Sequence, residues 1–361
     1  MFKNVLALLG LVFILAVITQ AVWSPERSAS VSTTQHQSDN PIELGKVNWI
    51  RDYDEGKKQS AATNKPIFLL FQEVPGCMTC KDYGADVLSH PLVVEAIESA
   101  FVPVAIYNNL GGKDRSVLQS FREPSWNNPV VRFVDSQNKD LVPRLSGDYT
   151  VAGLVKEMVN TLEQANKTVP TYLSLLHEEL QANRRGTETA TFSMHCFWTG
   201  ESRLGSLAGV VKTEAGFMNG QEVVQLAYDP NQISFVELTT AASKSKCARM
   251  VFTDSKEKQQ EAAQIVGTTR VAKRGTFRKD REPKYHLGRT TWRFVPMTEL
   301  QKIRVNTALS QRQSPWQYLS ARQVALHKYI DKHPNKGWKN VIESNAFFAD
   351  WRHAFELADN G

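Results

Sequence analysis

The stretch KPIFLLFQEVPGCMTC, residues 65–80, joins an apolar run to a pair of cysteines. Its IFLLF segment is continuously apolar, which is typical of a strand that is buried on both faces. The turn EVPG follows, and Cys77 and Cys80 then open a predicted helix. A second helical stretch at residues 92–99 precedes FVPVAIY, residues 101–107, which is the next predicted strand. The order strand, helix, strand predicts a parallel sheet in an α/β domain.

The C-x-x-C pair at the start of a helix indicates redox chemistry. The positive end of the helix dipole stabilises the thiolate of Cys77, and Cys80, one turn further on, can close a disulfide with it. A structural pair and half of a zinc site are the alternatives. The sequence holds no second C-x-x-C and no histidine pair at zinc-binding spacing, so no metal is expected.

Residues 45–168 resemble the thioredoxin-like family in the order of these elements. The resemblance implies that Pro129, in the segment NNPVVRFVD, is a cis-proline next to the redox pair. A cis Asn128–Pro129 bond is therefore expected. The segment YTVAGLVKEMVNTLEQA, residues 149–165, then supplies the closing amphipathic helix. The family's usual WCGPC is replaced here by VPGCMTC.

A second group of motifs begins at TFSMHCFWTGE, residues 191–201. It continues with LAGVVKTEAGF, EVVQLAYDP and ISFVEL, in that order along the chain. Together these segments resemble the A-type peptide methionine sulfoxide reductases, and the resemblance covers residues 187–325. It implies a second domain of α/β or α+β type and an oxidoreductase that acts on sulfur.

Sulfoxide reduction requires a cysteine of low pKa, an acid that protonates the departing oxygen, and an apolar wall around the methyl group. The resemblance implies that Cys196 is the nucleophile and Glu222 is the acid. It also places Phe197, Trp198 and Phe217 against the substrate.

Two positions depart from that family, which holds the sulfoxide oxygen with two tyrosines. Phe217 stands at the first position and Cys247 falls near the second. The missing hydrogen bond could come from Tyr285 or Tyr228. Cys247 itself is either a buried, inert thiol or the thiol that condenses with oxidised Cys196.

These observations predict thiol-dependent reduction of methionine sulfoxide in proteins, with the disulfide at Cys196 and Cys247 reduced by the Cys77/Cys80 pair. The partners are then oxidised proteins or peptides and an upstream thiol reductant, and no cofactor is needed. The alternative function is a thiol-disulfide oxidoreductase whose second domain binds oxidised peptides without catalysis.

The two ends of the chain carry further predictions. The apolar run within residues 1–23 predicts a membrane helix, as an uncleaved signal anchor or a signal peptide. Residues 24–44 are a predicted flexible linker. Lys3 and the amino terminus are expected to stay cytoplasmic, so the catalytic domains are expected in the periplasm or another extracytoplasmic space, anchored to the cytoplasmic membrane. Residues 326–361 are a predicted helical extension that covers the second domain.

The positive charge of the chain is concentrated late in the sequence. Between residues 270 and 339 there are 17 Lys or Arg against four Asp or Glu. Such a stretch is typically a solvated basic face, although nucleic acid or an anionic membrane could also bind it. The sequence contains no nucleic-acid-binding motif, so no nucleic-acid partner is expected.

Overall fold

The computed structural model describes residues 40–341 and 346–359. The first domain is built on a four-stranded sheet with the order β2-β1-β3-β4. The predicted parallel pair is present, because β1 and β2 run parallel, while β3 and β4 add antiparallel strands. The strands are β1 (Ile67–Gln72), β2 (Val102–Tyr107), β3 (Val130–Val134) and β4 (Leu145–Ser146).

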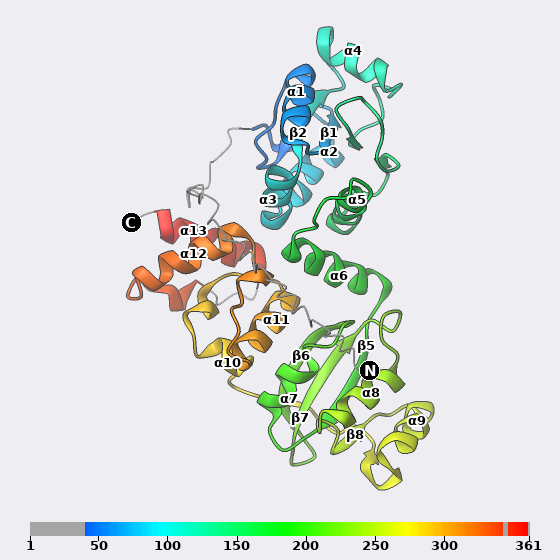
Figure 1. The fold of residues 1–361 in the computed structure, drawn as a ribbon, viewed down its shortest axis with the longest axis vertical. Coiled ribbons are helices and arrows are strands. Elements are labelled where there is room, and N and C mark those ends of the chain that lie inside the picture. Colours follow the sequence, from blue (N-terminus) through cyan, green and yellow to red (C-terminus); the bar gives the residue numbers. More distant parts are fainter. Residues whose placement is uncertain (1–39, 342–345, 360–361) are drawn as a thin grey trace, which may run out of the picture. The chain divides into compact units, whose positions relative to one another are not determined.

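Every residue of β1 is buried because the two faces of the sheet carry separate apolar cores. Phe68 and Leu70 belong to one core, and Ile67, Leu69 and Phe71 to the other. Alternate residues of a strand point to opposite faces, so a continuous apolar run is what a doubly covered strand needs. The helices around this sheet are α1 (Tyr53–Thr63), α2 (Met78–Asp82), α3 (Pro91–Ala100), α4 (Gly112–Ser120) and α5 (Val151–Gln164), with a π-helical turn η2 (Tyr83–Val87) after α2 (Figure 1).

The second domain contains a six-stranded sheet with the order β10-β6-β7-β5-β8-β9. Its longest strands, β6 and β7, form a hairpin across Asn219 and Gly220, which both have positive φ angles. An Asn-Gly pair favours this two-residue turn because both residues tolerate that conformation. The elements are β5 (Glu188–Ser193), β6 (Val210–Met218), β7 (Gln221–Tyr228), β8 (Met250–Phe252), β9 (Val271–Ala272), β10 (Arg278–Lys279), α7 (Phe197–Leu204), α8 (Phe235–Lys244) and α9 (Lys256–Val266).

Helix α6 (Thr171–Arg185) connects the two sheets in sequence, and the chain ends in further helices. The terminal helices contact the first domain: Arg322, in α12, forms a 2.7 Å ion pair with Glu98 of α3, and the ring of Phe347 stacks on His90. The contact of Phe347 with His90 thus brings the predicted extension, residues 326–361, against the first domain, whereas the sequence predicts that it covers the second. The remaining elements are α10 (Tyr285–Gly288), α11 (Glu299–Ser310), α12 (Ala321–Lys332), α13 (Phe347–Asp359), η1 (Ile42–Leu44), η3 (Thr268–Arg270), η4 (Thr291–Phe294), η5 (Trp316–Tyr318) and η6 (Trp338–Asn340).

The predicted membrane helix and the location derived from it require correction. Within residues 40–341 and 346–359, none of the helices combines the length and the apolar character that a bilayer crossing demands. The 15-residue α6, for example, carries charged residues along its length, whereas about 20 predominantly apolar residues are needed. The described helices therefore give no support to the predicted membrane anchor or to the periplasmic location derived from it. The stretch 1–23 that carried them lies outside the described residues, as do residues 24–39 of the predicted linker.

Candidate functional site

The Cys77 and Cys80 thiols face each other where the chain leaves β1 and enters α2. Their sulfur atoms are 3.8 Å apart and both cysteines are free. Cys77 is exposed at the N-cap of α2, whereas Cys80 is buried. The turn that precedes them requires Gly76, since a Cβ there would lie 2.4 Å from the carbonyl oxygen of Glu73. The pair therefore presents one accessible and one shielded sulfur.

The surroundings of the two sulfurs shift the pKa of Cys77 and the pKa of Cys80 in opposite directions. Hydrogen bonds to the Cys77 sulfur, chiefly from the backbone N–H of Cys80, lower the pKa of Cys77. Burial raises the pKa of Cys80 to about 12. The Cys80 thiol also donates a 2.8 Å hydrogen bond to Asn128 Oδ1, and the predicted cis Asn128–Pro129 bond is present. Cys77 is thus the more acidic and the more accessible of the two thiols.

One group of possible metal ligands includes this pair. Donor atoms of Glu73, Cys77 and Cys80 all lie within 4.8 Å of one another. Structural zinc sites take four protein ligands, and this group supplies three. The arrangement fits a dithiol with a neighbouring carboxylate better than a structural metal centre.

Alkylation should distinguish the two sulfurs of the first domain. In the reduced protein at pH 7, iodoacetamide is expected to modify Cys77 at least about a hundredfold faster than Cys80, because only the thiolate reacts. The Cys77 rate should rise with pH and level off below the range of an ordinary thiol, as a lowered pKa requires. Peptide mass spectrometry of the labelled sites measures both rates. Faster labelling of Cys80 would contradict this assignment.

Cys196 occupies the N-cap of α7, three residues after β5 ends, and is half-buried. The Thr199 hydroxyl donates to its sulfur at 3.4 Å. The next residue, Phe197, donates its backbone N–H to Glu222 Oε2 at 2.9 Å. The predicted nucleophile and the predicted acid are therefore joined through a single backbone amide.

Strand register explains how residues 26 positions apart come together. Ser193 of β5 pairs with Val223 of β7, and the N–H of Met194 donates to the carbonyl oxygen of Glu222 at 3.2 Å. Glu222 therefore lies at the end of the sheet where β5 ends and the chain continues into α7. His195 is exposed and lies beside this junction.

Aromatic side chains line the same end of the sheet. The ring centroids of Phe197 and Phe217 are 5.2 Å apart, and those of Phe197 and Trp198 are 5.4 Å apart. Tyr285, which belongs to α10, stacks on Trp198 at 3.9 Å with an interplanar angle of 15°. We call these four residues the aromatic wall. It supplies the apolar surface that the predicted chemistry requires beside Cys196.

Tyr228 and Tyr285, the two candidate hydroxyl donors, occupy very different positions in the second domain. Tyr228 is buried at the opposite end of β7, six residues or about 20 Å from Glu222. Its hydroxyl donates a 2.7 Å hydrogen bond to Glu188. Tyr285 is half-buried within the aromatic wall. Of the two, Tyr285 has the position from which a substrate could be reached.

Cys247 lies beyond the same end of the sheet as Cys196. Ser193 of β5 pairs with Met250 of β8; Cys196 follows Ser193 by three positions, and Cys247 precedes Met250 by three. Cys247 is 2% exposed, and its thiol donates to the carbonyl oxygen of Ser245 at 3.4 Å. The strand pair brings the two thiols to one region, with Cys247 in the core and Cys196 nearer the surface.

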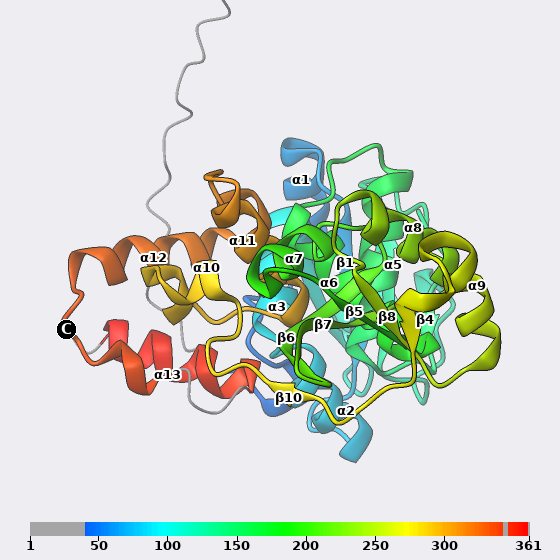
Figure 2. The same ribbon diagram turned by 90° about the horizontal axis from the view of Figure 1, so that it is seen from below.

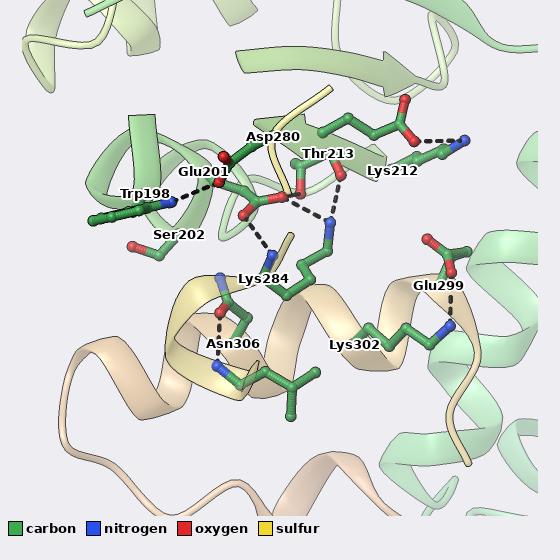
Figure 3. A network of polar contacts seen from close by, with 12 residues as sticks. Trp198, Glu201, Ser202, Lys212, Thr213, Asp280, Lys284, Glu299, Lys302 and Asn306 are labelled. Atoms are coloured by element: carbon green, nitrogen blue, oxygen red, sulfur yellow. Dashed lines mark hydrogen bonds and ion pairs between the residues drawn. The ribbon is translucent and has the colours of Figure 1, made fainter. Parts of the chain in front are cut away.

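A buried ion pair fastens α10 to α7. Lys284 Nζ donates to Glu201 Oε1 at 2.8 Å and also to the carbonyl oxygen of Thr213, and the Lys284 backbone N–H donates to Glu201 Oε2 at 3.2 Å. Figure 3 shows the ammonium between these acceptors, with the indole of Trp198 bonded to Asp280 nearby. This network fixes the segment that carries Tyr285. Sequence reasoning missed Lys284, because its partner lies 83 residues away and no motif links the two.

Comparison with known proteins finds a family match within the first domain. Residues 48–136 match the Thioredoxin-like family model. This part of the chain is a thioredoxin-like domain. A solved DsbH oxidoreductase structure is also matched, with a TM-score of 0.29 and 20% identity over 36% of this chain and 94% of that one.

The later region matches curated peptide methionine sulfoxide reductases, which confirms the predicted resemblance to a fusion with the thioredoxin-like domain. The Drosophila melanogaster enzyme is 32% identical over an alignment of 96 residues that covers 20% of this chain and 39% of that protein. The mitochondrial enzyme of Mus musculus is 30% identical over an alignment of 131 residues that covers 31% of this chain and 50% of that protein. The chain thus spans half or less of the length of these relatives. These matches show that the later region is similar to part of an oxidoreductase that acts on methionine sulfoxide.

Proposed function

We propose that this protein reduces methionine sulfoxide in polypeptides, with Cys196 as the nucleophile. The observation that carries the proposal is the placement of the Glu222 carboxyl group on the backbone N–H of Phe197, directly beside Cys196. A thiol, a carboxyl group and an aromatic wall at one sheet end are the groups that this reaction needs. The curated relatives, which are named as reductases of this substrate, support the same assignment.

The proposed first step forms a bond between the Cys196 sulfur and the sulfoxide sulfur. Glu222 protonates the sulfoxide oxygen through Oε1, because Oε2 is engaged by the Phe197 amide. The S–O bond of the substrate then breaks and the oxygen leaves as hydroxide. Hydroxide attacks the Cys196 sulfur and the S–S bond breaks, which releases the thioether and leaves Cys196 as a sulfenic acid. Tyr285 would supply the hydroxyl that Phe217 lacks, from the opposite side of the wall.

The proposed regeneration uses the remaining thiols. The Cys247 thiol condenses with the sulfenic acid, which forms a disulfide and releases water. Because Cys247 is buried, this step requires the loop around Ser245 to rearrange. Cys77 then attacks that disulfide and Cys80 resolves the mixed disulfide, so the oxidised Cys77–Cys80 pair awaits an external thiol reductant. Presence on one polypeptide raises the effective concentration of the two dithiols.

The absence of a hydroxyl at Phe217 favours one second candidate. In that candidate the thioredoxin-like domain is a thiol-disulfide oxidoreductase, and the second domain binds oxidised peptides without turning them over. Reduction of an unrelated protein disulfide would then be unchanged by Cys196→Ser. Methionine sulfoxide peptides would bind without any conversion in excess dithiothreitol.

A direct assay tests the proposal. The full-length protein, in excess dithiothreitol, is expected to convert a peptide with a single methionine sulfoxide to the methionine form, followed by liquid chromatography and mass spectrometry. Glu222→Gln should lower kcat/KM by about 10²- to 10⁴-fold, because the departing oxygen loses its proton donor. Glu257→Gln, on the exposed first turn of α9, is the matched control. A Glu222→Gln enzyme with the same kcat/KM as the control would remove Glu222 from the mechanism.

A further inference from the structure

An open basic cleft adjoins the aromatic wall. It has a volume of about 640 Å³ and is lined by Tyr285 together with Arg281, Arg289 and Arg293. All three arginines are exposed. Tyr285 therefore has one face against Trp198, at the candidate site, while it also borders the cleft. Figure 2 shows the course of the chain from β10 to α10.

One acidic residue, Glu282, also lines the cleft, and Asp280 lies next to it along the chain; both are already engaged. Glu282 forms a 3.2 Å ion pair with Arg289. Asp280 accepts the indole N–H of Trp198 at 3.0 Å and the backbone N–H of Arg281 at 2.8 Å. The guanidinium of Arg293 donates to a backbone carbonyl oxygen. Within the described part of the chain, the guanidinium of Arg281 has no acidic partner, so the cleft keeps a net positive charge.

A further cation lies on the other side of the aromatic wall. The guanidinium of Arg278 is 4.4 Å from the ring centroid of Phe217, and Arg278 is exposed. Its β10 neighbour Lys279 is instead paired with Glu214 at 2.9 Å. Positive charge thus flanks the wall at Phe217 and at Tyr285, while the wall itself is apolar.

We propose that the site selects polypeptides in which acidic residues flank the methionine sulfoxide. This inference rests on the proposed function, and it adds the class of sequence that the enzyme takes. In the complex, the methionine sulfoxide side chain contacts the aromatic wall. Asp or Glu side chains before and after it in the substrate pair with the arginines of the cleft and with Arg278. Exposed arginines attract such carboxylates at a distance and pair with them on contact.

Three peptides test the inference. They share one central methionine sulfoxide and differ only in flanking Asp, Ser or Lys residues, and the full-length protein turns them over in excess dithiothreitol. At low ionic strength, kcat/KM for the Asp peptide is expected to exceed that for the Lys peptide by about tenfold, as a few exposed ion pairs allow. The ratio should fall towards one in 0.5 M salt, because exposed charges are screened.

Charge-reversed variants test whether Arg278 and Arg281 cause the preference for the Asp peptide. Arg281→Glu combined with Arg278→Glu should bring the Asp-to-Lys ratio to one or below. Lys273→Glu, an exposed reversal in the same domain, should leave the ratio unchanged. A ratio near one in the unchanged protein, or a ratio that the double variant does not move, overturns the inference. Tighter binding of a single-stranded oligonucleotide than of the Asp peptide would also overturn it. No turnover of any of the three peptides would instead reject the proposed function itself.

Discussion

Cys196→Ser is expected to abolish methionine sulfoxide reduction, with a loss of about 10³-fold or more in kcat. A serine hydroxyl at neutral pH is a far weaker nucleophile towards the sulfoxide sulfur than a thiolate. The measurement is peptide turnover in excess dithiothreitol, which can reduce the oxidised enzyme directly. The assay therefore reports on attack at the substrate and not on regeneration.

Two other variants make this result specific. His195→Ala changes an exposed neighbour of the nucleophile and should retain activity close to that of the unchanged protein. In the absence of dithiothreitol, Cys247→Ser should complete one turnover and should accumulate a sulfenic acid at Cys196, detectable by dimedone labelling. If Cys196→Ser turns over peptide at the rate of His195→Ala, the proposal that Cys196 reduces methionine sulfoxide fails.

The largest expected effect on stability comes from Lys284→Ala. Glu201 is 1% exposed, so removal of the lysine leaves a buried carboxylate without its cation. Loss of one partner from such a pair typically lowers the free energy of unfolding by about 3–5 kcal/mol. Urea unfolding at pH 7, followed by intrinsic tryptophan fluorescence, should show a clear decrease in the midpoint.

The chain supplies a matched control for this prediction. Lys279 and Glu214 form an ion pair of similar length, 2.9 Å, but the lysine side chain is 54% exposed. Lys279→Ala should therefore change the free energy of unfolding by about 1 kcal/mol or less. Replacement of the buried pair by Lys284→Met with Glu201→Leu should restore most of the loss. Equal destabilisation by Lys284→Ala and Lys279→Ala would show that burial does not govern the pair.

Local patterns were sufficient to predict the redox pair and much of the first sheet. A continuous apolar run predicts a doubly buried strand, and β1 is such a strand. Placement of Cys77 and Cys80 needs only the turn and the helix that follow, which are contiguous in sequence. For the N-terminal segment an apolar run alone predicts a membrane helix, and none of the described helices supports a membrane crossing.

The sequence by itself therefore determined the features that contiguous residues encode: the strand before the C-x-x-C pair, the two thiols, and the motif around Cys196. Only the tertiary structure decided which distant groups meet there. It placed Glu222 at the Phe197 amide, Tyr285 on Trp198 and Lys284 on Glu201. The physical reason is that strand register and buried ion pairs join residues far apart in the chain, and neither leaves a periodic signal in the sequence.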